Sequence, residues 1–181
     1  MKFSTVLPAL SLLSAAAAQT FSKYTDDNGI EFYRGKFTTG VGKGDAYFGL
    51  ALPPASETSL MNEYIGSMAV PIPASGTWFG LSHMSEMTSS LLLLMWPNGK
   101  EVMADFRYAT GYTAPDEYTG NATLSIISSS VNDTYYELTY RCENCWSWEQ
   151  DAVPGSQVPA TTSGAAQLIG CLLYTSPSPR D

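Results

Sequence analysis

Short segments in which apolar and polar residues alternate with a period of two run along most of this 181-residue chain. A period of two is that of an extended strand, and no long segment carries the period of an α-helix. Clusters of Gly, Pro, Asn and Asp separate the segments, as in antiparallel sheet proteins. We therefore predict an all-β protein, an antiparallel β-sandwich, with a loop at 151–163 and strands at residues 29–37, 45–52, 63–70, 77–83, 101–110, 122–130, 134–142 and 164–170.

The first 18 residues, MKFSTVLPALSLLSAAAA, have the composition of a secretory signal peptide. Lys2 supplies a short positive start, and Val6–Leu13 is an apolar stretch that is too short to span a bilayer. Ala15–Ala18 supply the small side chains that a signal peptidase requires. We expect cleavage near Ala18 and a secreted, extracellular protein.

Composition agrees with secretion and narrows the class of partner. Asn121-Ala122-Thr123 and Asn132-Asp133-Thr134 are sequons, so Asn121 and Asn132 are candidate N-glycosylation sites in a secreted protein. The formal net charge of −8 argues against a nucleic-acid partner. No segment after the signal peptide reaches the length of a transmembrane helix, so we expect no membrane contact.

The last eleven residues, CLLYTSPSPRD at 171–181, read as the in-frame translation of a sequencing adapter. The prolines of SPSPR end any strand, and nothing in the segment follows the pattern before it. A natural Ser/Pro tail is the alternative. We therefore expect one domain at 19–170 that is truncated at its C-terminal end, with the natural chain continuing past Gly170.

Several chemistries lack the residues that they need. A Ser-His-Asp or Cys-His hydrolase requires a positioned base, and His83, the only histidine, lies in no nucleophile motif. Cys142 and Cys145 have CxxC spacing, but zinc would need four ligands and covalent haem attachment would need a His where Trp146 stands. In a secreted sandwich we expect these two cysteines to form a disulfide.

Met87 lies four residues after His83, and Met with His is a known axial pair for haem iron. Axial ligands approach the iron from opposite faces of the porphyrin. Residues i and i+4 point to the same side on a helix and on a strand, so these two neighbours cannot sandwich one haem. From spacing alone, Met87 is better explained as a core side chain.

The chain resembles the cytochrome domain of fungal cellobiose dehydrogenase, a DOMON-type haem domain, over residues 21–170. The motifs that carry the resemblance are M-T-x-x-L-L followed by W-P, then A-T-G-Y, then R-C-x-N-C-x-S-W. They lie within WFGLSHMSEMTSSLLLLMWPNGKEVMADFRYATGY at 78–112 and GNATLSIISSSVNDTYYELTYRCENCWSWEQD at 120–151, and GAAQLIG at 164–170 is similar as well. Each motif is weak alone, and their combination is specific.

The resemblance implies an immunoglobulin-like sandwich that holds one haem b. Met87 matches the axial methionine, and Tyr112 matches a tyrosine beside a haem propionate. The second ligand would be a histidine beyond Gly170, and His83 would have no ligand role. The family's domain takes electrons from a flavin dehydrogenase domain and passes them to lytic polysaccharide monooxygenases, which are copper enzymes. We therefore expect a non-catalytic electron carrier with those partners.

Two alternatives remain open at this point. The same sandwich could be a haem-free module that contacts carbohydrate through Trp146, Trp148 or Tyr112, because exposed aromatic rings stack on sugars. It could also be the N-terminal part of a complete cellobiose dehydrogenase, which a downstream nucleotide-binding glycine motif would reveal.

Overall fold

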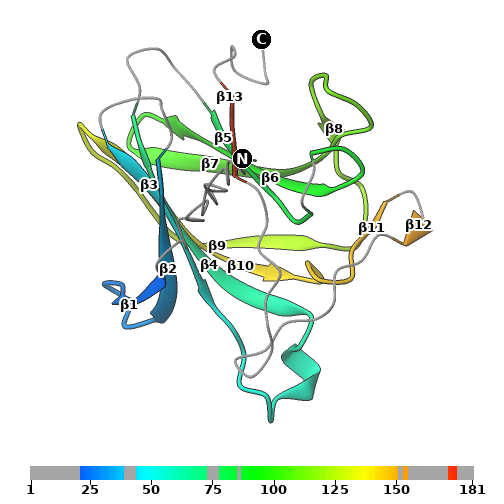
Figure 1. The fold of residues 1–181 in the computed structure, drawn as a ribbon, viewed down its shortest axis with the longest axis horizontal. Helices are drawn as coiled ribbons and strands as arrows, with labels where there is room; N and C mark the ends of the chain where they lie inside the picture. The colour runs from blue at the N-terminus through cyan, green and yellow to red at the C-terminus, as the bar shows by residue number, and fades with distance from the viewer. Residues whose placement is uncertain are drawn as a thin grey trace, which may run out of the picture.

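A computed structural model describes residues 21–38, 44–72, 78–84, 87–150, 153–154 and 171–174. The predicted signal peptide at 1–18 and the predicted strand at 164–170 lie outside these residues. Within them the chain is almost entirely β-structure, arranged as two layers of antiparallel strands (Figure 1). The predicted β-sandwich is confirmed.

The first layer, which we call the large sheet, has six strands in the order β1-β2-β3-β4-β10-β9. All of its neighbouring strands are antiparallel. A register shift interrupts the β9–β10 pairing between Thr139 and Tyr140. The strands are β1 (Phe21–Thr25), β2 (Glu31–Thr38), β3 (Asp45–Ala51), β4 (Glu63–Pro71), β9 (Thr123–Val131) and β10 (Tyr135–Glu143).

The second layer, the small sheet, has five strands in the order β13-β5-β6-β7-β8. These are β5 (Trp78–Ser82), β6 (Leu91–Asn98), β7 (Glu101–Tyr108), β8 (Asp116–Glu117) and β13 (Cys171–Tyr174). A separate two-stranded ribbon pairs β11 (Glu149–Gln150) with β12 (Val153–Pro154), and η1 (Thr58–Leu60) is a single 3₁₀ turn.

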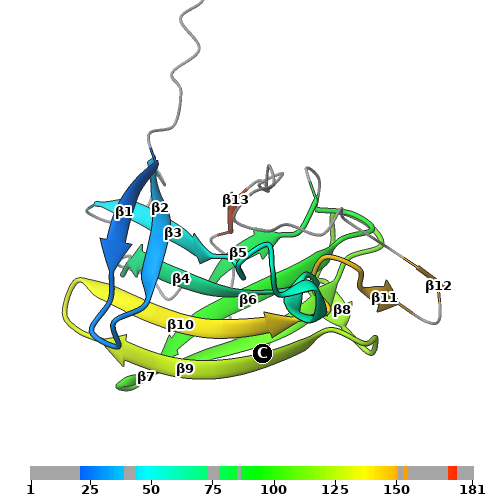
Figure 2. The ribbon, with the colours of Figure 1, turned by 90° about the horizontal axis from the view of Figure 1, so that it is seen from below.

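The main core fills the space between the two sheets. It takes alternate residues of β3, β4, β5, β6, β7 and β10, because successive side chains of a strand point to opposite faces. Phe48, Met68 and Leu138 come from the large sheet and stand opposite one another in register. Phe79, Leu93 and Phe106 come from the small sheet. Figure 1 shows β9 and β10 in one layer and β6 and β7 in the other, and in the view from below β9 and β10 lie in front of β6 (Figure 2).

Six strands were not predicted from the sequence. Four of them, β1, β6, β8 and β11, lie outside every predicted strand, β12 lies inside the segment predicted as a loop, and β13 lies in 171–181. Residues 91–95 show no alternation because both faces of β6 are apolar, so its pattern has no period. Cys171–Tyr174 pairs with β5 as β13, although we expected no strand in 171–181. Its four residues are apolar or aromatic and precede the prolines, and the edge of β5 offers free backbone groups.

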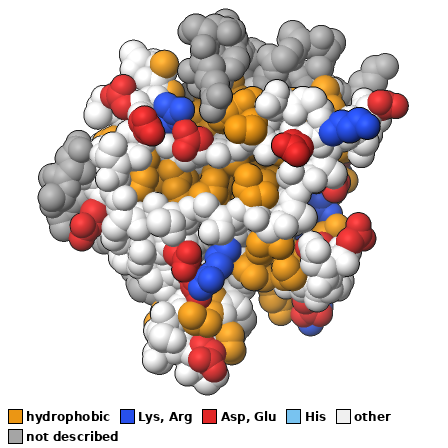
Figure 3. Space-filling model, turned by 180° about the vertical axis from the view of Figure 1, so that it is seen from behind, with side chains coloured by type: hydrophobic (Ala, Val, Ile, Leu, Met, Phe, Trp, Pro, Cys, Tyr) orange, Lys and Arg blue, Asp and Glu red, His pale blue; other side chains and the backbone are white. Residues whose placement is uncertain are grey.

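The surface is scattered with single acidic and basic side chains rather than covered by one charged field. Figure 3 shows this for one face, where hydrophobic side chains gather in patches between isolated Asp, Glu, Lys and Arg residues. Among the described residues, no helix has the length and apolar character needed to cross a membrane.

Candidate functional site

Strand β6 of the small sheet is apolar on both of its faces. Leu91, Leu93 and Met95 of β6 point into the main core. The alternate residues of the same strand, Leu92, Leu94 and Trp96, point away from the large sheet and belong to a second cluster. An ordinary sandwich carries polar side chains on such an outward face. This second cluster, the outer cluster, consists of Trp78, Met87, Leu92, Leu94 and Ala109 with Trp96 packed against it.

Met87 is placed in the outer cluster by the connection between β5 and β6. The backbone N–H of Ser89 donates to the carbonyl of Ala109 over 2.7 Å, and Thr88 forms a parallel bridge with Ala109. Ser89 has a φ of 55°, so the chain turns sharply there. Only 5% of Met87 is exposed. The thioether is therefore held at a fixed place against the outer apolar face.

Arg107 borders the same face and was not predicted from the sequence. It stands opposite Leu92 in the β6–β7 pairing, so its side chain leaves the sheet beside the outer cluster. One terminal nitrogen, Nη2, lies 2.9 Å from Asp105, whereas the buried Nε has no hydrogen-bond partner. The sequence does contain a pattern that could have found it, because the alternation in MADFRY puts Asp105 and Arg107 on the outward face. A guanidinium that has an unpartnered donor and lies beside an apolar surface suits an apolar ligand that carries carboxylates.

Tyr112, the other predicted site residue, lies in the connection between β7 and β8 and is 77% exposed. It follows Ala109, the anchor of the Met87 segment, by three positions. The structure therefore brings both predicted residues to connections that meet at Ala109.

His83 lies in the main core and not on the outer face. It is completely buried, and its Nδ1–H donates to the carbonyl of Leu91 over 2.9 Å. Its Nε2 accepts from the Tyr64 hydroxyl over 2.6 Å. Burial lowers the pKa of His83 to about 4, with the hydrogen bond to Leu91 opposing that shift. A neutral imidazole with both nitrogens engaged is a structural core group.

Cys142 and Cys145 form a disulfide with a Cα–Cα distance of 5.8 Å. Their sulfurs and a nitrogen of His83 lie within 4.8 Å of one another, a grouping that metal ligands can have. The disulfide removes both thiolates from that role, because a metal binds the ionised thiol. The three residues therefore form a packed structural cluster.

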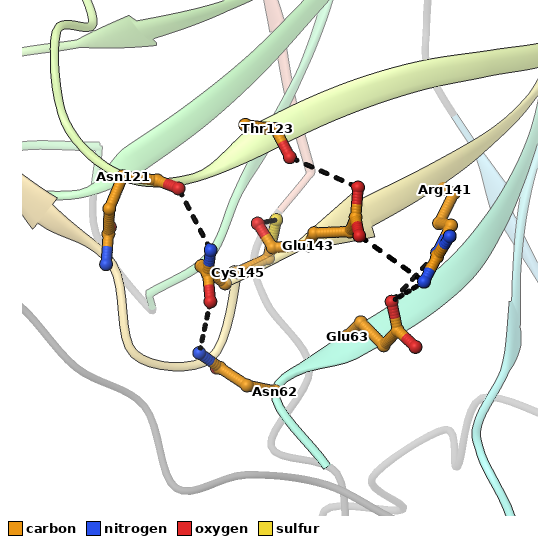
Figure 4. Close-up of polar contacts among 8 residues, drawn as sticks. Asn62, Glu63, Asn121, Thr123, Arg141, Glu143 and Cys145 are labelled. Carbon is orange, nitrogen blue, oxygen red and sulfur yellow. Dashed lines mark hydrogen bonds and ion pairs between the residues drawn. The ribbon is translucent and has the colours of Figure 1, made fainter. Parts of the chain in front are cut away.

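Polar contacts fix the turn that contains this disulfide (Figure 4). Asn62 donates to Asn144 Oδ1 over 3.1 Å and accepts from the Trp146 backbone over 3.1 Å. Asn144, whose φ is 60°, donates to the carbonyl of Asn121 over 3.1 Å. Arg141 lies 2.6 Å from Glu63. The turn packs Trp146 and Trp148 inward, at 1% and 2% exposure, so neither ring can stack on a sugar. Of the three aromatic residues that the haem-free alternative offered, Tyr112 is the exposed one.

A family model for the cytochrome domain of cellobiose dehydrogenase matches residues 24–177. The chain belongs to this family. It is 32% identical over 181 residues to the pyrroloquinoline quinone-dependent pyranose dehydrogenase of Coprinopsis cinerea, covering 99% of this chain but only 23% of that protein's length. The family match includes the beginning of the predicted adapter segment, and the origin of 171–181 stays a prediction.

Two solved structures are similar to this cytochrome domain. The cytochrome domain of Myriococcum thermophilum cellobiose dehydrogenase has a TM-score of 0.69 and 36% identity, over 79% of this chain and 69% of that one. The cytochrome b domain of Coprinopsis cinerea pyranose dehydrogenase has a TM-score of 0.68 and 29% identity, over 90% and 79%.

The residues of the outer face fit a haem, the cofactor that the family implies. The outer cluster supplies buried apolar side chains that would pack against a porphyrin, and Met87 adds a thioether at its margin. The unpartnered Nε of Arg107 supplies a buried donor beside it. This is an outward apolar sheet face with a soft ligand and a cation, and nothing in an ordinary sandwich requires that combination.

The two sequons differ in how their asparagines are used. Asn121 accepts from Tyr118 and from the Glu149 backbone, and its Nδ2, the atom that a glycan would occupy, donates to the carbonyl of Ser147. In Asn132 only the Oδ1 is engaged, by Thr134 and Tyr135. Asn132 is thus the more accessible of the two predicted glycan acceptors.

Proposed function

We propose that this cytochrome domain is a secreted carrier of single electrons that holds haem b on the outer face of the small sheet. The outer cluster with Met87 at its margin is the observation that carries the proposal. Haem bound there would supply a one-electron iron couple. The chain's own contribution is an apolar surface that excludes water, a thioether for the iron, and Arg107 and Tyr112 for the polar edge.

Thioether ligation raises the reduction potential of haem iron relative to stronger donors. Two axial ligands would leave no open coordination position, so the site would exchange electrons without binding a substrate at iron. His83 is the only histidine of the sequence, and it is engaged by Tyr64 and Leu91 in the main core. We therefore propose that the second ligand is a histidine in sequence downstream of Gly170.

We propose a flavin dehydrogenase domain as the electron donor and a copper polysaccharide monooxygenase as the acceptor. The family supports a dehydrogenase donor. The similarity to a pyrroloquinoline quinone-dependent dehydrogenase favours a second candidate, in which a quinone cofactor takes the place of the flavin. The chain spans 23% of that relative's length, and one domain of such an enzyme, or of a complete cellobiose dehydrogenase, is a further candidate.

Stopped-flow absorbance of the haem-loaded, full-length protein tests this proposal. A flavin dehydrogenase with its sugar substrate should reduce the haem, and a copper monooxygenase added next should reoxidise it faster than oxygen does. A quinone-dependent dehydrogenase replaces the flavin enzyme in a parallel run and decides between the two donors. If neither donor reduces the haem while dithionite does, the electron-carrier proposal with these partners is wrong.

A further inference from the structure

A polar groove lies on the outer face of the large sheet, on the side opposite the main core. It encloses about 180 Å³ between the β1–β2 hairpin and strands β4, β9 and β10. The residues that matter for its chemistry are Arg34, Ser67, Ser128, Thr139, Glu137 and Asp27. None of them belongs to the outer cluster or to its neighbours, so the proposed electron transfer does not explain them.

The strand register builds the floor of the groove. Arg34, Gly49, Ser67, Thr139 and Ser128 stand opposite one another in one row across the large sheet. Residues that are directly opposite share a face, so the polar side chains of this row point the same way. A Cβ at Gly49 would lie 3.4 Å from the Cβ of Arg34 and 3.1 Å from that of Phe32. The glycine therefore leaves room in the floor between Arg34 and Ser67.

Two residues of this floor are largely buried, and their hydroxyls face the groove. Ser67 and Thr139 are each 6% exposed. Neither side chain makes a hydrogen bond to another described residue, although both line the groove. Neither oxygen is among the buried atoms that lack a partner, so both hydroxyls are open to the groove and can take partners from it. A ligand with hydroxyl groups in the groove would supply those partners.

Arg34 is held in place but has no anionic partner. Its guanidinium lies 4.2 Å from the ring centroid of Tyr24 and 4.7 Å from that of Tyr47, so two aromatic rings fix its plane. None of the ion pairs in the described part of the chain involves it, and its buried Nε is unpartnered. Arg34 is therefore a preoriented donor.

The tip of the β1–β2 hairpin forms the far wall. Asn28 donates to Ser128 Oγ over 3.3 Å, which ties the tip to β9 across the groove. Asp26 accepts from the backbones of Asn28 and Ile30 over 3.0 and 2.8 Å, so the turn is well defined. Figure 2 shows this tip beside the ends of β9 and β10.

We propose that this groove binds a neutral oligosaccharide and that one pyranose ring of the oligosaccharide occupies the groove. The carboxylates of Asp27 and Glu137 would repel an anionic ligand, and the guanidinium of Arg34 would repel a metal cation. A sugar ring presents hydroxyls that donate and accept, which matches a lining of hydroxyls, carboxylates and one guanidinium. The volume admits a single ring and is smaller than a typical site for a drug-sized molecule.

Titration calorimetry and amide chemical-shift mapping test the proposal on the haem-loaded, full-length protein in its reduced, diamagnetic form. The probes are cellotetraose, xylotetraose and mannotetraose, each titrated separately. At least one should bind, with shifts confined to the β1–β2 hairpin and to β4, β9 and β10. Arg34→Leu should weaken that binding about tenfold, because a charge-assisted hydrogen bond is lost.

Thr139→Val keeps the shape of the side chain and should weaken binding about threefold or more. Thr58→Val, in η1 outside the groove, is the matched control and should bind as the wild type does. The haem absorption spectrum should be the same in all variants, which separates this proposal from the proposed electron transfer. The proposal is wrong if no probe binds, if shifts map elsewhere, or if Arg34→Leu and Thr139→Val bind as well as the wild type.

Discussion

His83→Leu should destabilise the protein by about 2 kcal/mol at pH 7.5, because the Tyr64 hydroxyl is then buried without its acceptor. The Tyr64 hydroxyl lies 2.6 Å from His83 and has only a long 3.4 Å contact to Tyr140 besides. Leu91 keeps its backbone hydrogen bond from the His83 N–H, so its carbonyl is less affected. Urea unfolding followed by tryptophan fluorescence measures the loss.

The same substitution should change how stability depends on pH. Burial lowers the pKa of His83 to about 4, against about 6.5 in an unfolded chain. Between these values the unfolded state binds more protons, so the free energy of unfolding falls as the pH falls from 6.5 to 4. The loss amounts to about 3 kcal/mol over this window. His83→Leu should lack this component, so the difference between the two proteins should narrow at acidic pH.

The double variant His83→Leu, Tyr64→Phe is the control. Replacing both partners by apolar groups removes the unpaired hydroxyl and should recover part of the stability. It should also keep the flatter pH dependence. Equal pH dependence in wild type and His83→Leu would show that His83 is not a neutral group whose protonation opposes folding.

Met87→His should lower the reduction potential of the haem-loaded, full-length protein by on the order of 100 mV while leaving the iron six-coordinate, because imidazole is a stronger donor than a thioether. The choice of axial ligands sets the reduction potential of haem iron over a range of about 0.8 V. Spectroelectrochemical titration measures the shift.

Met103→Leu is the matched control for this substitution. Met103 stands opposite Trp96 in the β6–β7 pairing, so it lies on the outward face of the small sheet without belonging to the outer cluster. Its replacement should leave the potential unchanged. A Met87→His protein with the wild-type potential would contradict the assignment of Met87 as a ligand.

Alternation predicted most strands correctly because one face of each is buried and the other is solvated. It missed β6 because its two faces serve two different apolar surfaces, the main core and the outer cluster. The apolar character of both faces of β6 is thus the reason that alternation missed this strand, and it is also the feature that identifies the candidate site. Four consecutive leucines in a sandwich strand indicate a second apolar surface, and the residues from Leu91 to Leu94 could have been interpreted so.

The spacing of His83 and Met87 excluded them as ligands of the same haem but did not show where in the fold either side chain lies. The structure puts them on opposite faces of the small sheet, a result of the strand register between Ser82 and Leu92 that no local pattern reveals. Arg107 was missed for a similar reason, since its importance depends on standing beside Leu92. The floor of the polar groove also joins residues far apart in sequence, which only the register of the large sheet brings into one row.

The absorption spectrum of haem-loaded, full-length Met87→Ala tests the central claim most directly. Wild type should show the spectrum of a six-coordinate, low-spin haem, and so should Met61→Ala, which removes a thioether beside η1, far from the outer cluster in sequence. Met87→Ala should lose that spectrum, because alanine offers no ligand to the iron. An unchanged six-coordinate, low-spin spectrum in Met87→Ala would contradict the account.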